Sequence, residues 1–150
     1  MATAFTTYTD GTVVAAASGG NYAGAPAHTV LTGFYDATRR NMTVDTDTMA
    51  LINIPAGTLV HNVVLEVITI EATATPVISV GDATDPNGWV ASESTAVAGK
   101  FLGAGAYAIA TGTSKTNGKL YTTATTINLE QTTTDSTTLK CKVHVICTIV

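Results

Sequence analysis

Apolar and polar residues alternate along much of this chain, most clearly in its last twelve residues. One set of alternate positions holds Leu139, Cys141, Val143, Val145, Cys147 and Ile149. Because successive side chains of a strand point to opposite faces, this pattern predicts a strand with one buried face. Burying six such side chains contributes on the order of 10 kcal/mol before chain entropy is subtracted. The opposite face begins charged and ends apolar, which indicates that a second element or a neighbouring chain covers its last residues.

Shorter segments with strand patterns lie upstream and are separated by turn signals. Strands are expected within residues 29–35, 42–47, 49–54, 59–72, 76–80, 120–131 and 139–150, and turns within 36–41, 55–57, 85–88 and 132–136. Residues 18–28 and 93–99 are expected to be loops. The chain therefore predicts an all-β fold of one antiparallel domain with about eight strands, either a β-sandwich or a barrel. Residues 1–28 form an extended N-terminal arm or irregular segment in this interpretation, and residues 29–150 form the sandwich domain.

Composition strengthens this interpretation and narrows the possible partners. One residue in five is threonine, which favours strands over helices. Charged residues make up only 12% of the chain, about half of the usual ~25%. The net charge of −4 and the scattered lysines argue against a nucleic-acid partner. Residues 11–35 carry no charged side chain, but Gly, Asn and Pro residues interrupt them. The stretch lacks the ~20 consecutive apolar residues of a membrane span, so no span is expected.

The two cysteines lie on the same face of the last predicted strand. Cys141 and Cys147 are six residues apart, hence roughly 20 Å along a strand, so they cannot form a disulfide with each other. We expect buried free thiols, which fits folding in a reducing cytoplasm.

Candidate catalytic and ligand-binding groups are few, and for each a structural role is favoured. The segment from Asp82 to Gly88 carries oxygen donors that suit Ca²⁺, but an Asp-Pro-Asn-Gly turn is favoured because the closing glutamate of an EF-hand is missing. The sole tryptophan, Trp89, is interpreted as a core or interface anchor, with a carbohydrate platform as the alternative. The pair Asp45 and Asp47 is interpreted as solvated charge. No catalytic residue, metal ligand or cofactor is predicted, and the protein is not expected to be an enzyme.

Three turn-rich segments together resemble a known class of proteins. They are Ile54-Pro55-Ala56-Gly57-Thr58, Ile78-Ser79-Val80-Gly81-Asp82 and Asp85-Pro86-Asn87-Gly88-Trp89. In this order they are similar to capsid decoration (cement) proteins of tailed bacteriophages. The resemblance implies a trimeric, jelly-roll-like sandwich on the outer surface of the virion, which clamps major capsid subunits after the head expands. It carries no catalytic residues over to this chain.

Five residues are the candidates for contacting the capsid. Phe5, Tyr8 and Tyr22 lie in the N-terminal segment, and aromatic side chains are enriched at interface hot spots. Arg39 and Arg40 form the only basic pair and suit an acidic capsid patch, with Asp36 and Asp45 nearby as a partial offset. The alternatives are another phage component, such as a head fibre base or a tail protein, or a carbohydrate-binding module that uses Trp89 and the loop of residues 82–87.

Overall fold

The computed structural model describes residues 5–9, 12–16, 27–40, 42, 47–71, 76–102, 118–133 and 135–149. Eleven strands lie in this part of the chain: β1 (Phe5–Thr9), β2 (Thr12–Ala16), β3 (Ala27–Asp36), β4 (Asp47–Ile54), β5 (Thr58–Thr69), β6 (Val77–Gly81), β7 (Val90–Ser94), β8 (Gly99–Leu102), β9 (Lys119–Tyr121), β10 (Thr125–Gln131) and β11 (Lys140–Ile149). No helix occurs among the described residues. The predicted all-β class is confirmed.

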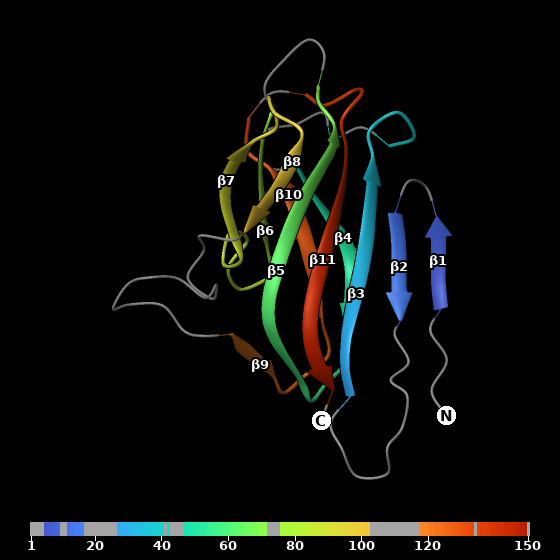
Figure 1. The fold of residues 1–150 in the computed structure, drawn as a ribbon, viewed down its shortest axis with the longest axis vertical. Helices are drawn as coiled ribbons and strands as arrows, with labels where there is room; N and C mark the ends of the chain where they lie inside the picture. Colours follow the sequence, from blue (N-terminus) through green and yellow to red (C-terminus); the bar gives the residue numbers. More distant parts are fainter. Residues whose placement is uncertain are drawn as a thin grey trace.

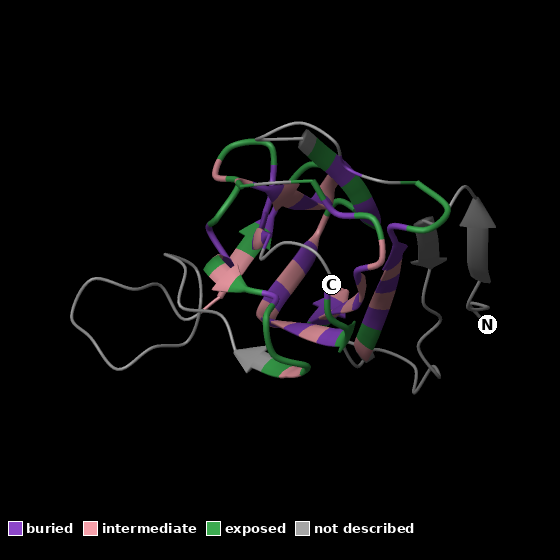
Figure 2. Cartoon of the chain, turned by 90° about the horizontal axis from the view of Figure 1, so that it is seen from above, coloured by how far each residue is buried: buried purple, intermediate pink, exposed green. Residues whose placement is uncertain are grey.

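The strands form two antiparallel sheets that pack face to face (Figure 1). The first sheet has the order β1-β2-β3-β11-β5-β8, with β9 also paired to β5, and the second has the order β4-β10-β6-β7. In the view from above, buried residues line the space between the two layers (Figure 2). The predicted β-sandwich is therefore confirmed, while its jelly-roll connectivity stays a prediction.

The strand with the clearest alternation lies in the centre of the first sheet. β11 pairs along its full length with β3 on one side and with β5 on the other. Cys141, Val143, Val145 and Cys147 are completely buried, which confirms the predicted inner face. Ile146, on the outer face, is 40% exposed, so no described element covers this part of that face. Cover by a neighbouring chain stays a prediction.

Differences from the expected elements concern short strands and strand ends. About eight strands were expected, but β8 and β9 contain only four and three residues, too few for a visible alternation. β3 begins at Ala27, so His28 belongs to a strand and not to the expected loop. Residues 93–99 contain the end of β7 and the start of β8 around a turn. The expected strand over 42–47 lies mostly outside the described residues, as does Asp45.

The predicted turns are confirmed where the structure describes them. Gly57 adopts a φ of 78° between β4 and β5, a left-handed conformation that glycine tolerates without strain. Between β6 and β7 the Gly88 N–H donates to the carbonyl of Asp85. Gly81 precedes this turn, and a Cβ there would collide with the backbone of Asp85 and Pro86. The chain can therefore fold back tightly only because residue 81 lacks a side chain.

Candidate partner-binding surfaces

Two of the predicted aromatic contacts lie on β1. The β1–β2 hairpin pairs Phe5 with Ala16 at its open end and Tyr8 with Val13 near its turn. Phe5 and Tyr8 are thus three residues apart, about 10 Å along the strand. Their side chains, and all of Tyr22, lie outside the described part of the structure. The role of these three residues as contacts stays a prediction.

The two arginines lie in an exposed turn that directly follows β3. The N–H groups of Arg39 and Arg40 donate to the carbonyl of Asp36 at 3.1 and 3.2 Å, and both arginines are exposed. The carboxylate of Asp36 accepts hydrogen bonds from the N–H and hydroxyl of Thr38. It also forms an ion pair with Lys140 at 3.1 Å. Burial alone would raise the pKa of Asp36, but these bonds outweigh burial and lower it. The described partners of this carboxylate are therefore Thr38 and Lys140, rather than the arginine pair that it was expected to offset.

The fold brings the arginine turn and the ends of β1 and β2 at Thr9 and Thr12 to the same end of the first sheet (Figure 1). Thr12, the first residue of β2, pairs with Tyr35 next to the end of β3. Val13, the next residue of β2, pairs with Tyr8 on β1. Tyr8, Arg39 and Arg40 therefore share one end of the sheet, whereas Phe5 lies at the far end of β1.

Exposed apolar side chains form a feature that the sequence showed only in part. Val30 on β3 and Ile146 on β11 are direct cross-strand neighbours, and they are 56% and 40% exposed. Ile68 and Ile70, at the end of β5, are exposed to a similar extent. The sequence shows that the end of β11 is apolar. That Ile146 lies next to Val30 follows only from the register between β11 and β3.

A row of polar side chains crosses the outer face of the first sheet. Thr32 Oγ1 lies 3.1 Å from His144 Nδ1, and His144 Nε2 lies 2.9 Å from a carboxylate oxygen of Glu66. Lys100 Nζ is 3.9 Å from the other oxygen of that carboxylate. The hydrogen bond from His144, opposed by burial and helped by the nearby lysine, lowers the pKa of Glu66. These contacts link side chains on four neighbouring strands of the sheet, namely β3, β11, β5 and β8. Cys141 points into the core from the same strand as His144, so the two residues form no catalytic pair.

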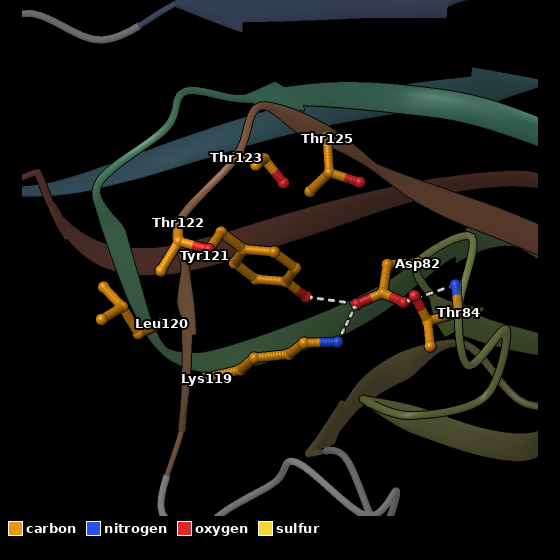
Figure 3. A pocket seen from close by; sticks show the side chains of 8 residues that line it. All are labelled: Asp82, Thr84, Lys119, Leu120, Tyr121, Thr122, Thr123 and Thr125. Atoms are coloured by element: carbon orange, nitrogen blue, oxygen red, sulfur yellow. Dashed lines mark hydrogen bonds and ion pairs between the residues drawn. The ribbon is translucent and has the colours of Figure 1, made fainter.

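The loop expected to be a turn or an ion site borders a pocket of about 170 Å³ (Figure 3). Asp82 Oδ1 accepts the N–H groups of Thr84 and Asp85 at 2.9 and 3.0 Å. Its Oδ2 accepts Lys119 Nζ at 2.6 Å and the hydroxyl of Tyr121 at 2.7 Å. Burial alone would raise the pKa of Asp82, but these four bonds lower it. The expected turn, in which the side chain of Asp82 binds the backbone of its own loop, is confirmed, and a lysine neutralises the carboxylate.

Trp89, which follows the same loop, is completely buried. Its indole N–H donates to the hydroxyl of Tyr121 at 3.0 Å. The interpretation as a core anchor is confirmed, and a sugar-stacking role for Trp89 is wrong because no face of the ring reaches solvent. The network instead fastens β9 of the first sheet to the end of β6 in the second.

Other candidate chemistry is sparse in the described part of the chain. Cys141 and Cys147 are buried free thiols, and burial raises their pKa values to about 12 and about 11. Among the described residues, no three His, Cys, Asp or Glu side chains gather closely enough to hold a metal ion. None of the described residues belongs to a helix that could cross a membrane.

The fold of the chain is similar to that of chains in two phage capsid structures. No protein-family model matches the chain, and no curated protein does. A chain in the acidic stable capsid structure of Helicobacter pylori bacteriophage KHP30 matches with a TM-score of 0.55 and 17% identity, over 81% of this chain and 86% of that one. A chain in the capsid asymmetric unit of cyanophage Pam1 matches with a TM-score of 0.61 and 17% identity, over 90% and 94%. At this identity the likeness shows a shared fold.

Proposed function

We propose that this protein is a non-enzymatic component of a bacteriophage head. In this role it decorates the outer surface of the expanded capsid, as a homotrimer, and cements neighbouring major capsid subunits. The observation that carries the proposal is the match to chains in two phage capsid structures, each covered over most of its length. The resemblance of residues 54–58, 78–82 and 85–89 to decoration proteins points in the same direction independently of the fold.

The chemistry of the described side chains supports a binding role over catalysis. The buried carboxylates of Asp36, Glu71 and Asp82 are each held by several hydrogen bonds within the fold. Each has a lowered pKa, so each is ionised near neutral pH and poorly suited to act as a general acid or base there. The exposed groups include an arginine turn and the neighbouring apolar side chains of Val30 and Ile146, which suit contacts with another protein.

Stabilisation of the head would follow from mass action. A protein that binds only the assembled shell stabilises it by RT ln(1 + [L]/Kd) at each site. A trimer engages three subunits at once, so that individually weak contacts add through avidity. We place the centre of the contact surface at the end of the first sheet that carries Arg39, Arg40 and Tyr8. Phe5, at the far end of β1, and Tyr22 are further aromatic anchors in this proposal.

The test uses expanded and unexpanded heads of the phage that encodes this chain. Purified protein should co-sediment with expanded heads lacking it and should raise the temperature at which they release DNA. The double variant Arg39→Ser/Arg40→Ser should bind about tenfold more weakly. A matched control, Lys100→Ser/Lys142→Ser, removes the same charge from the outer sheet face and should bind within about twofold of the unmodified protein. Equal loss in both variants contradicts the location of the site, and absence of binding to heads contradicts the function.

The N-terminal segment is tested by a chain that begins at Ala27, where β3 starts. Weaker binding to expanded heads is expected if the aromatic residues contact the capsid, and unchanged binding rejects them as anchors. Electron microscopy of particles with the protein labelled separates this role from the alternatives: label at a head fibre base or on the tail contradicts decoration. The carbohydrate-binding alternative has lost its main feature, because Trp89 is buried.

A further inference from the structure

The β1–β2 hairpin is complete in itself but barely joined to the sheet. All five residues of β1 pair with β2, from Phe5 opposite Ala16 to Thr9 opposite Thr12. β2 lies close to both β3 and β4, yet its ladder with β3 consists of one pair, Thr12 with Tyr35. The hairpin is therefore a structural unit whose main-chain attachment to the described body is minimal.

The edge of β3 that faces the hairpin is largely unused. β3 pairs with β11 along all ten residues, from Ala27 to Asp36. On its other edge, Tyr35 is the only residue for which the described strands provide a ladder partner. Long open edges favour pairing with another strand. Val30, which lies on β3 itself, has an exposed side chain on the outer face, and its neighbour Ile146 lies one strand further into the sheet, on β11.

The register of an added strand is already set by the existing pair. Continued in the antiparallel sense, β2 would place Val13, Val14, Ala15 and Ala16 opposite Phe34, Gly33, Thr32 and Leu31. Small and β-branched residues of this kind suit a strand. The sequence of β2 is therefore compatible with a full ladder that the single chain does not form.

We propose that the β1–β2 hairpin completes this ladder on β3 of a neighbouring copy, so that copies of the chain are joined by exchanged hairpins. The ten residues 17–26 that link β2 to β3 are Ala-Ser-Gly-Gly-Asn-Tyr-Ala-Gly-Ala-Pro, and they can span up to roughly 33–36 Å when extended. Exchange of an identical element between copies is a low-cost route to oligomers and closes a ring when the symmetry is cyclic. The inference does not depend on the role in the capsid, because it concerns the purified protein alone.

The experiment places one cysteine on each of two differently tagged full-length chains. One chain carries Ala15→Cys and the other Thr32→Cys, and the two are co-expressed, purified together and oxidised. The exchanged ladder brings these positions opposite each other, so a disulfide-linked heterodimer should be the main product on a non-reducing gel. Native Cys141 and Cys147 should not interfere, because they are completely buried and their pKa values are raised.

Three further samples make the result decisive. Ala15→Cys with Val30→Cys is two residues out of register on the same face of β3, and should cross-link at least about fivefold less. Val13→Cys with Phe34→Cys tests the same register if the substitution of Thr32 disturbs folding. A third sample is a single chain that carries both Ala15→Cys and Thr32→Cys. Hairpin exchange links two such chains by disulfides, whereas pairing of the hairpin with its own β3 forms the disulfide within one chain. A purely intramolecular disulfide overturns the exchange, and absence of cross-links at both in-register pairs overturns the ladder.

Discussion

Glu71 provides the sharpest test of how this sandwich is held together. It lies two residues after the end of β5 and is only 5% exposed. Its carboxylate accepts the N–H groups of Thr137, Thr138 and Leu139 at 2.6, 2.8 and 3.2 Å. It also accepts both threonine hydroxyls at 3.0 Å. The side chain of Glu71 thus fixes the turn that leads into the central strand β11. The substitution Glu71→Gln should weaken these hydrogen bonds, because it replaces one acceptor oxygen by an NH₂ donor.

The magnitude follows from the pKa of this carboxyl group. Burial alone would raise it, but the hydrogen bonds from Thr138 and Thr137 outweigh burial and lower the pKa from 4.5 to about 2. At ~1.4 kcal/mol per pKa unit, ionised Glu71 contributes about 3 kcal/mol to the free energy of unfolding. Because the pKa in the folded state lies below that in the unfolded state, this contribution is complete above pH 4.5 and is lost as the pH falls towards 2.

Urea unfolding at one protein concentration measures the effect. At pH 7, Glu71→Gln should lower the free energy of unfolding by about 3 kcal/mol, and at pH 2.5 by only about 1 kcal/mol. Glu130→Gln is the matched control, since Glu130 is half-buried on β10 and no described residue gives its side chain a hydrogen bond. It should change stability by less than ~0.5 kcal/mol. An equal loss for Glu71→Gln at both pH values, or a loss below 1 kcal/mol at pH 7, would refute the reasoning.

Three further predictions test other parts of the fold. Val143→Asp places an unpaired charge in the core and should abolish the β-sheet circular dichroism spectrum, whereas Lys142→Asp on the outer face should fold. Fluorescence of Trp89 should be blue-shifted and resist iodide in the native protein, and ready quenching contradicts its burial. Lys119→Met leaves the buried carboxylate of Asp82 without its cation and should lower the free energy of unfolding by about 1–3 kcal/mol at pH 7. The loss should shrink in acid as Asp82 becomes protonated, and an unchanged urea midpoint contradicts this role.

Much of the fold could be predicted because its longest strands carry strict alternation. The inner residues of β11, Ile127 and Leu129 on β10, and the turn after β6 all follow from local pattern. The resemblance to phage capsid proteins, made on three short segments, agrees with the fold shared with chains in two phage capsids. The short strand β8 was missed, and β9 was merged with β10 into one expected strand, because three or four residues cannot display a period of two.

For the candidate capsid-contact surface, the sequence predicted which residues take part but not where they lie relative to one another. The sequence singles out Arg39 and Arg40, but the hairpin register is needed to place Tyr8 at the same end of the sheet and Phe5 at the other. Asp36 was expected to offset part of the positive charge of the arginines. In the structure its carboxylate accepts hydrogen bonds from Thr38 and forms an ion pair with Lys140. These outcomes depend on which strands lie side by side.

The sequence by itself determined the β class, the inward faces of the long strands and the sharp turns, because these depend on neighbours a few positions away along the chain. Only the tertiary structure decided the order β3-β11-β5, the open edge of β3, and the partners of the buried carboxylates. Glu71 meets Thr137 across 66 positions, and Asp82 meets Lys119 across 37. Such pairs form because two sheets enclose a space from which water is excluded, where an ionised group must find its partners within the protein. No local pattern records which partners those are.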